Sequence, residues 1–457
     1  MTAHPWVGRV IAIERSGRVL HLDRLVHQYP GKRLIFRGHL ADGEPVAAKF
    51  YLGFLRQGWE WLRGLRGARL LQRSGVASPN LHHAGYCREA TAWLAVFDWI
   101  EADEPWPPST WPLARADHRR LIEILAAHHH AGVVQKDMNW RNFIPRCGRL
   151  YTVDTDRVSG RPAPLNRARS LARVTDVYAS KSRIPDQELH WAYNEYCDHR
   201  GWQACDYERL RFIQGIRKAR VEHARMVARR SFRGWKHYRR FATRRCRVVF
   251  DQRAISSETV EQFVAKHCAS AEPESMQLEP SLPAIGMSVH AIPELRRRSA
   301  GAGPSFVRKP TARHTWLNNV TLRRLAFAAP KGVALIEDRG RQRTWLISEK
   351  TDVTPLASSL IRASAEERGQ FIEALRDLLV EMKKYRILNR AWRLDALGWD
   401  GDRIWLLDVS EIRFHPWFLP GFDRRWQREL EAFLAILSTY MRSPTESLRL
   451  IMDPPDP

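Results

Sequence analysis

The chain contains the segment His130-Ala-Gly-Val-Val-Gln-Lys-Asp-Met-Asn-Trp-Arg-Asn-Phe143, followed by Arg149-Leu-Tyr-Thr-Val-Asp-Thr-Asp-Arg157. Asp137 stands five residues before Asn142, and Asp154 comes twelve residues after Asn142, at the end of a short apolar run. Oxygen atoms of such side chains are the ligands that Mg²⁺ prefers, and it takes only one or two of them from a protein. The spacing therefore predicts a proton acceptor, Asp137, beside two metal ligands, Asn142 and Asp154. The alternative is that these residues form ordinary Asx turns.

The spacing of these three residues is typical of the catalytic loop and the metal-binding aspartate of a kinase. In such a site Asp137 would accept the proton of an attacking hydroxyl group. Asn142 and Asp154 would hold Mg²⁺ against the phosphates of ATP. The segment therefore predicts phosphoryl transfer, with ATP and Mg²⁺ as the cofactors.

The same residues resemble the lipopolysaccharide core kinase family, which comprises bacterial sugar kinases with an atypical protein-kinase-like fold. That family carries His-x-Asp-Leu-x-x-x-Asn, followed by an apolar strand ending in Asp-x-Asp-Arg, and Asp154-Thr-Asp-Arg157 matches the second motif. Two positions differ, because Gln135 stands where the family has histidine and Lys136 precedes the expected base. The family histidine mainly gives packing and hydrogen-bonding support, so Gln135 leaves the base and the metal ligands in place.

This resemblance implies an α+β fold of two tandem protein-kinase-like domains, each with a small β-rich lobe and a helical lobe. It implies a sugar hydroxyl of the lipopolysaccharide inner core, on heptose or Kdo, as the acceptor. It also implies a cytoplasmic protein, peripheral at the inner face of the inner membrane. The implied partners are lipopolysaccharide core or another anionic glycolipid, and proteins of lipopolysaccharide assembly. The rival hypothesis is a non-catalytic scaffold or regulator of envelope assembly with the same fold.

Runs of β-forming residues between residues 8 and 51 predict strands, with a hairpin turn at residues 41–43. The second strand of this hairpin carries Lys49, which would contact the α- and β-phosphates of ATP; the alternative is a surface lysine. A helix glutamate normally holds such a lysine, and Glu60 is the only acidic residue from position 50 to position 74. Three glycines, at positions 58, 64 and 67, lower the helix propensity around Glu60.

Residues 92–100 predict an apolar strand that leads into Asp98-Trp-Ile-Glu101. In a kinase this is the hinge that hydrogen-bonds adenine, so Asp98 and Trp99 are the expected nucleotide contacts. The histidine triplet at residues 128–130, just before the candidate catalytic loop, does not predict a metal site. Three consecutive helical residues point in different directions and do not converge on one ion.

A net charge of +24 and an isoelectric point near 10.4 stand out in a chain whose hydrophobic content, 44%, is ordinary. The excess predicts a polyanionic partner: a nucleic acid, an anionic membrane face or a phosphorylated glycolipid. No nucleic-acid-binding motif is present, so the first class is not favoured. The aromatic residues of segment 190–202 fit either base stacking or core packing. A length of 457 residues predicts two or three domains.

No run of 18 apolar residues occurs, so no spanning helix is expected, and the first residues do not predict a secretory signal. Six cysteines are scattered without Cys-x-x-Cys spacing, which predicts free thiols in a reducing compartment rather than a metal site or disulfides. Residues 209–247 are rich in cations, with apolar residues at helical spacing. They predict a basic amphipathic helix suited to an anionic surface. The alternative is a solvated helix that also packs on its own domain.

The second half of the chain repeats the pattern of the first with an offset of 254 residues, because Arg403-Ile-Trp-Leu-Leu-Asp408 aligns with residues 149–154. The offset places Ala391 on Asp137 and Ala396 on Asn142. Alanine neither takes a proton nor binds a cation, so this half predicts a degenerate kinase-like domain, unless the spacing matches by chance. The expected divisions are an intact kinase-like domain at 1–250, a linker with the start of a degenerate lobe at 251–304, and a pseudokinase domain at 305–457.

Overall fold

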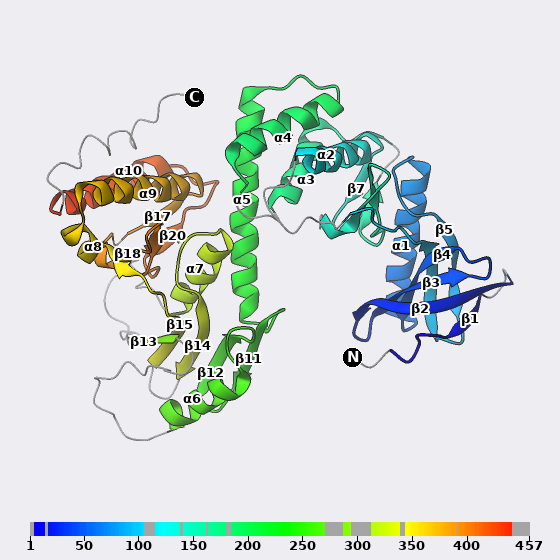
Figure 1. The fold of residues 1–457 in the computed structure, drawn as a ribbon, viewed down its shortest axis with the longest axis horizontal. Helices are drawn as coiled ribbons and strands as arrows, with labels where there is room; N and C mark the ends of the chain where they lie inside the picture. Colours follow the sequence, from blue (N-terminus) through cyan, green and yellow to red (C-terminus); the bar gives the residue numbers. More distant parts are fainter. Residues whose placement is uncertain are drawn as a thin grey trace, which may run out of the picture. The chain divides into compact units, whose positions relative to one another are not determined.

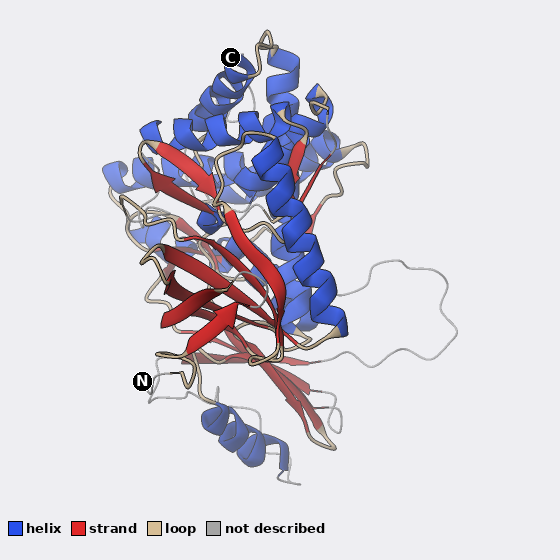
Figure 2. Ribbon diagram, turned by 90° about the vertical axis from the view of Figure 1, so that its right-hand side faces the viewer, coloured by secondary structure: helices blue, strands red, loops and turns tan. Residues whose placement is uncertain are grey.

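The protein, in a computed structural model, has the predicted mixed α+β class, with helices and strands throughout the chain (Figure 1) and both kinds abundant (Figure 2). The structure describes residues 4–13, 17–104, 115–137, 140–160, 163–179, 184–269, 287–293, 312–338, 343–390 and 392–440. The chain forms two compact units, Met1–Ile216 and Arg217–Pro457, which we term the first and second units. Their division falls inside helix α5 (Asp206–Ser231) rather than at residue 250 as expected.

A six-stranded antiparallel sheet begins the first unit. Its strands, in spatial order, are β1 (Val10–Ile13), β2 (Arg18–Tyr29), β3 (Arg33–Leu40), β4 (Pro45–Leu52), β6 (Ala92–Asp98) and β5 (Leu81–Cys87). Side chains alternate between core and outer face along β3, which buries Leu34 and Phe36. Strands β3 and β4 form the predicted hairpin, and Gly43 supplies the positive φ in its turn. Helix α1 (Leu55–Arg73) connects β4 to β5 and contacts β4 and β6.

The remainder of the first unit is mostly helical. Its helices are α2 (Arg115–His130), α3 (Arg167–Ala179), α4 (Asp186–His199) and the start of α5. Between α2 and α3 lie β7 (Val133–Gln135), the 3-10 turn η1 (Trp140–Asn142), β8 (Phe143–Arg146), β9 (Arg149–Thr152) and β10 (Val158–Gly160). Tyr193 and Tyr196 of α4 are fully buried, so they serve core packing, not base stacking.

The second unit has its own five-stranded sheet, in the order β11 (Tyr238–Ala242), β12 (Cys246–Asp251), β14 (Gly332–Asp338), β15 (Arg343–Glu349) and β13 (Met287–Pro293). Helices α6 (Ser257–Ala269) and α7 (Ala312–Arg324) accompany this sheet. Helices α8 (Leu356–Arg362), α9 (Ala365–Lys384) and α10 (Phe422–Ser438) follow, with short strands β16 (Thr354–Pro355), β17 (Ile387–Asn389), β18 (Leu397–Trp399), β19 (Ile404–Leu406) and β20 (Ile412–Phe414), and the turn η2 (Leu394–Ala396).

The internal repeat predicted from the sequence is present in the strand pairing. Gln135 of β7 pairs with Val158 of β10, and Asn389 of β17 pairs with Ile412 of β20. In the neighbouring hairpins, β8 pairs with β9 and β18 pairs with β19, and their registers are likewise related by the offset of 254 residues. The two 3-10 turns, η1 and η2, follow the same offset. The alignment therefore reflects a shared local structure and not a chance match of spacing.

The basic segment 209–247 differs from the expected single helix, because α5 ends at Ser231 and β11 and β12 follow. Their residues pair with each other and β12 pairs with β14, which places them in the sheet of the second unit. The apolar residues Ile216, Val221 and Val227 of α5 are buried, so its apolar face packs within the protein. The region 251–304, expected to hold a linker and the start of a degenerate lobe, contains α6 and β13. None of the helices in the described ranges is long and apolar enough to cross a membrane.

Candidate active site

Gln135, at the end of β7, connects the two segments that carry the predicted catalytic residues. Its side chain is 2% exposed. Its Nε2 donates a hydrogen bond to the carbonyl oxygen of Asp154 at 2.7 Å, and its Oε1 accepts one from the backbone N–H of Asp137 at 3.4 Å. An amide can donate and accept at once, so it supports both loops in the way expected of the family histidine.

Asn142 lies in η1 and is held against the same loop. Its Nδ2 donates to the carbonyl oxygen of Asp137 at 2.9 Å, and its own carbonyl oxygen accepts from the N–H of Val153 at 2.9 Å. These bonds leave Oδ1 as the atom of Asn142 suited to a hard cation. Asp154 Oδ1 accepts a hydrogen bond from the N–H of Asp156 at 3.4 Å, which is the Asx-turn contact of the alternative interpretation.

Lys49 points from the central strand β4 toward Asp154. Its Nζ donates to the carbonyl oxygen of Val153 at 3.2 Å and lies 4.0 Å from Asp154 Oδ1. The residue is only 8% exposed, which excludes the alternative of a surface lysine. Burial lowers the pKa of Lys49, the Asp154 carboxylate opposes this shift, and Arg33 adds to it. The ammonium therefore has one carboxylate neighbour, and that carboxylate is itself partly open to solvent.

Glu60 lies on α1 but does not form the expected pair with Lys49, since no ion pair joins them among the described residues. A different acidic residue anchors this region. Asp156 is buried, forms an ion pair with Arg33 and accepts a hydrogen bond from Tyr51 Oη at 2.7 Å. The two aspartates of the Asp-x-Asp motif therefore have different contacts. Asp154 faces Lys49, and Asp156 fixes the loop to the sheet.

The glycines of α1 explain how this helix approaches the loop. A Cβ atom at Gly64 would lie 2.6 Å from Asp156 Oδ1, and a Cβ atom at Gly67 would lie 2.1 Å from the carbonyl oxygen of Thr155. The same glycines lower helix propensity, as predicted, but their role is to let the helix backbone contact residues 155 and 156 directly. These glycines were visible in the sequence, but the close contact that they permit with residues 155 and 156 was not.

The predicted hinge residues are engaged within the protein. The Asp98 carboxylate accepts from the N–H and from Nδ2 of Asn80, both at 2.8 Å, and it pairs with His82. The backbone N–H of Asp98 donates to Asn80, and that of Trp99 donates to Pro45, each at 3.0 Å. These N–H groups are therefore committed to holding the end of β6. Adenine recognition at this edge would fall to the residues that follow Trp99.

The first two histidines of the triplet take part in core hydrogen bonds. His128 Nε2 lies 2.9 Å from Thr152 Oγ1, and His129 Nδ1 lies 2.7 Å from Tyr196 Oη. Burial lowers the pKa of His128 to about 4 and that of His129 to about 3, where the neighbouring charges add to the shift. Both rings are therefore neutral at pH 7, and they join α2 to two different neighbours.

Two other groups of side chains have the composition of metal ligands among the described residues. Cys246, Cys268 and Asp338 are all buried in the second unit, and their ligand atoms lie within 4.8 Å of one another. Glu44, His82 and Asp98 form the other group, at the edge of the first sheet. The scattered cysteine positions gave no sign of the first group, because its members come from different parts of the chain.

No protein-family model matches the chain. No curated protein is significantly similar to it either. What the site does must therefore be argued from its geometry and charge.

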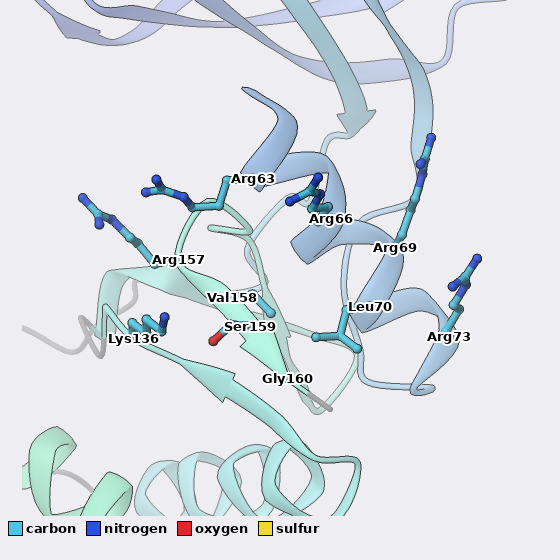
Figure 3. Close-up of a pocket in the computed structure, with 10 residues that line it drawn as sticks. All are labelled: Arg63, Arg66, Arg69, Leu70, Arg73, Lys136, Arg157, Val158, Ser159 and Gly160. Atoms are coloured by element: carbon cyan, nitrogen blue, oxygen red, sulfur yellow. The ribbon is translucent and has the colours of Figure 1, made fainter. Parts of the chain in front are cut away.

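A hollow of about 840 Å³ lies beside the loop that carries Asp137. It is lined by six cations, with Leu70, Val158, Ser159 and Gly160 (Figure 3). The cations are Arg63, Arg66, Arg69, Arg73, Lys136 and Arg157, and we term this hollow the cationic groove. In the sequence, Lys136 precedes the expected base and Arg157 ends the second motif, and neither position by itself predicted an anion site. The arginines of α1, at steps of three and four, were the available signal.

The corresponding part of the second unit has a different chemistry. Ala396 is buried in η2, at the position related to Asn142. Arg393 Nη2 lies 3.5 Å from Asp408 Oδ2, so a guanidinium group stands beside the carboxylate related to Asp154. Ala391, the residue aligned with Asp137, lies outside the described residues.

Proposed function

We propose that the first unit is a kinase domain that transfers a phosphoryl group from ATP to a hydroxyl acceptor with the help of Mg²⁺. The observation that carries this proposal is the approach of buried Lys49 to Asp154, beside the loop that Gln135 ties to Asp137. A lysine on a rigid strand facing a metal-binding aspartate is the arrangement that phosphoryl transfer requires. The sheet order around β4, with α1 inserted before β5, also suits the small lobe of a protein-kinase-like fold.

In the proposed reaction each residue has one task. Lys49 would contact the phosphates of ATP, while Asp154 and Asn142 Oδ1 would bind Mg²⁺. When bound, the ion neutralises phosphate charge and orients the transferred group. Asp137 would take the proton of the acceptor hydroxyl. At the same time the hydroxyl oxygen bonds to the γ-phosphorus and the bond between this phosphorus and ADP breaks.

We also propose the acceptor that the resemblance implies, a sugar hydroxyl of the lipopolysaccharide inner core, with peripheral binding at the inner membrane face. The net charge of +24 supports an anionic glycolipid as the partner. In the same proposal the second unit is a degenerate repeat without catalysis. The guanidinium of Arg393 beside Asp408 supports this, because it supplies a positive charge where the first unit would bind a cation.

The test is phosphoryl transfer by the purified full-length protein, with Mg²⁺-ATP and core oligosaccharide, followed by mass spectrometry and phosphorus NMR. Asp137→Ala should lower the rate by about 10²-fold or more and should leave ATP binding intact. Asp408→Ala is the matched control and should leave the rate unchanged. Full activity in the Asp137→Ala variant would exclude the proposed role of this residue.

The second candidate function is a non-catalytic kinase-like scaffold in envelope assembly. It is favoured by the engaged N–H groups of Asp98 and Trp99 and by the separation of Glu60 from Lys49. A scaffold would bind its glycolipid or protein partner equally well with and without Mg²⁺-ATP. It would also show no phosphorylated product with any core oligosaccharide.

A further inference from the structure

The cationic groove consists of six positive side chains that no carboxylate balances. Arg63, Arg66, Arg69 and Arg73 follow one side of α1, where residues three and four apart are neighbours. No acidic residue lines the groove, and none of its six cations forms an ion pair within the described part of the chain. Like charges at this spacing destabilise a helix, so the arrangement costs free energy unless an anion binds there.

Several other arginines of the first unit do form ion pairs. Arg119 pairs with Glu195, and Arg120 pairs with both Glu104 and Asp117. On the later helices, Arg167 pairs with Glu208, and Arg209 pairs with Asp206. What distinguishes the groove is that six such cations line one hollow.

The groove shares its backbone with the candidate catalytic loop. Lys136 directly precedes Asp137, and its N–H donates to the carbonyl oxygen of Arg157 at 3.0 Å. In Figure 3 Lys136, Arg157 and Arg63 surround one end of the groove, and Arg66, Arg69 and Arg73 continue along α1. A ligand that fills this space therefore has its charged groups on α1 and one end next to Asp137.

A second hollow, of about 920 Å³, extends the same surface, since it shares Lys136, Ser159 and Gly160 with the groove. It adds Arg169 and Arg173 of α3, and Arg173 has a carboxylate partner in Asp176. Among the residues that the structure describes, no aromatic side chain lines either hollow. Base stacking contributes strongly to binding of single-stranded nucleic acid, and this surface offers no ring for it. Guanidinium groups, by contrast, bind phosphate oxygens with two parallel hydrogen bonds.

We propose that the cationic groove binds phosphate groups already present on the acceptor, so that the substrate is a multiply phosphorylated molecule other than a nucleic acid. That the bound molecule is the phosphoryl acceptor rests on the proposed kinase function. Binding of its phosphates to the groove can be measured without turnover. The phosphates can belong to a soluble phosphorylated saccharide or to a lipid headgroup. Both present the same chemistry to α1.

Binding to the full-length protein is measured at fixed ionic strength with three probes. They are a deacylated core oligosaccharide carrying phosphates, its enzymatically dephosphorylated form, and a single-stranded RNA of similar charge. The test variant is Arg63→Gln/Arg66→Gln/Arg69→Gln. The matched control is Arg424→Gln/Arg425→Gln/Arg428→Gln on α10, which removes the same charge from another exposed helix. Circular dichroism and thermal unfolding establish that both variants are folded.

The groove variant should bind the phosphorylated oligosaccharide about 10- to 100-fold more weakly, as expected for the loss of charge-assisted hydrogen bonds. The control variant should keep the wild-type affinity for the phosphorylated oligosaccharide. The dephosphorylated oligosaccharide should bind weakly to the wild type and to both variants. Together these two results separate the effect of the groove from that of general charge. Equal losses in the two variants, or equal affinity for both forms of the oligosaccharide, would overturn the proposal. Tighter binding of the RNA through the same arginines would overturn the assigned ligand class.

Vesicles with and without phosphorylated glycolipid distinguish the two sources of phosphate. Tighter binding to vesicles than to the free oligosaccharide would assign the phosphates to a lipid headgroup. Tighter binding to the free oligosaccharide would assign them to the soluble saccharide. Either preference supports the proposal if the groove variant no longer shows that preference. With an active acceptor, the groove variant should raise KM more than it lowers kcat. Groove-specific binding without any turnover would refute the kinase function and leave the phosphate site standing. Turnover with an unchanged KM in the groove variant would refute the phosphate site alone.

Discussion

Lys49 Nζ lies 4.0 Å from Asp154 Oδ1, which brings the middle strand of the first sheet and the loop after β9 to one point. The lysine is buried, whereas the carboxylate is 22% exposed. Burying an ammonium group costs free energy that a carboxylate at this distance only partly offsets. The pair therefore contributes little to stability by itself.

This asymmetry predicts opposite effects for two single substitutions. Lys49→Met should leave the free energy of unfolding unchanged or raise it by up to about 2 kcal/mol, because it removes a buried charge. Asp154→Ala should lower it by about 1–2 kcal/mol, because the ammonium loses its one carboxylate neighbour. Urea unfolding at pH 7 measures both, and both variants should lose phosphoryl transfer. A larger stability loss in Lys49→Met than in Asp154→Ala would contradict this description.

Gln135 should be required for the alignment of the two loops. Gln135→Ala removes the bonds to Asp154 and Asp137 and should lower kcat about 10- to 100-fold with a small change in KM for ATP. Gln135→His introduces the residue of the resembling family and should recover much of the rate, since a neutral imidazole also donates and accepts. Steady-state kinetics of the three forms make the comparison. If kcat of Gln135→His is no higher than that of Gln135→Ala, hydrogen bonding at position 135 does not determine the rate.

The close packing of α1 on the Asp154 loop predicts that Gly67 does not tolerate a methyl group. Gly67→Ala should lower the free energy of unfolding by about 2–3 kcal/mol, because its Cβ would lie 2.1 Å from the carbonyl oxygen of Thr155. Gly369→Ala, in the middle of α9 with no atom within 4 Å of its Cβ, is the control. It should raise stability by about 0.5–1 kcal/mol. Denaturant midpoints of the two variants that shift in the same direction would contradict this prediction.

The buried histidines predict a loss of stability in mild acid. Burial lowers the pKa of His128 to about 4 and that of His129 to about 3, so below pH 6.5 the unfolded chain binds protons that the folded chain does not. The stability they contribute is complete above that pH and falls as the pH drops toward the folded pKa values. Each should account for about 2 kcal/mol at pH 5 relative to pH 7.

The measurement is the free energy of unfolding at pH 7 and pH 5. His129→Gln keeps a partner for Tyr196 Oη and carries no titrating ring, so it should lose less stability between the two pH values than the wild type. His130→Gln, at the exposed third residue of the triplet, is the matched control substitution. An identical loss in the wild type and in His129→Gln would show that this ring does not titrate as described.

Local patterns in the sequence determined several features by themselves. The offset of 254 residues, read from Arg149–Asp154 and Arg403–Asp408, aligned two segments whose hairpins, β8–β9 and β18–β19, have registers related by the same offset. Short hairpins form between neighbours in the chain, so their residue types and spacing carry a strong signal. The hairpin of β3 and β4 was predictable for the same reason.

Tertiary structure alone decided which side chains meet. It paired Lys49 with Asp154 and not with Glu60, and it used Asp156 to fasten the loop to Arg33 and Tyr51. It also turned the arginines of α1 toward the loop of Asp137, and it ended the basic helix at Ser231. These contacts join residues far apart in the chain, and they depend on how a helix without side chains at positions 64 and 67 packs on a loop. No local periodicity carries that information, since such packing is chosen by the fit of whole elements.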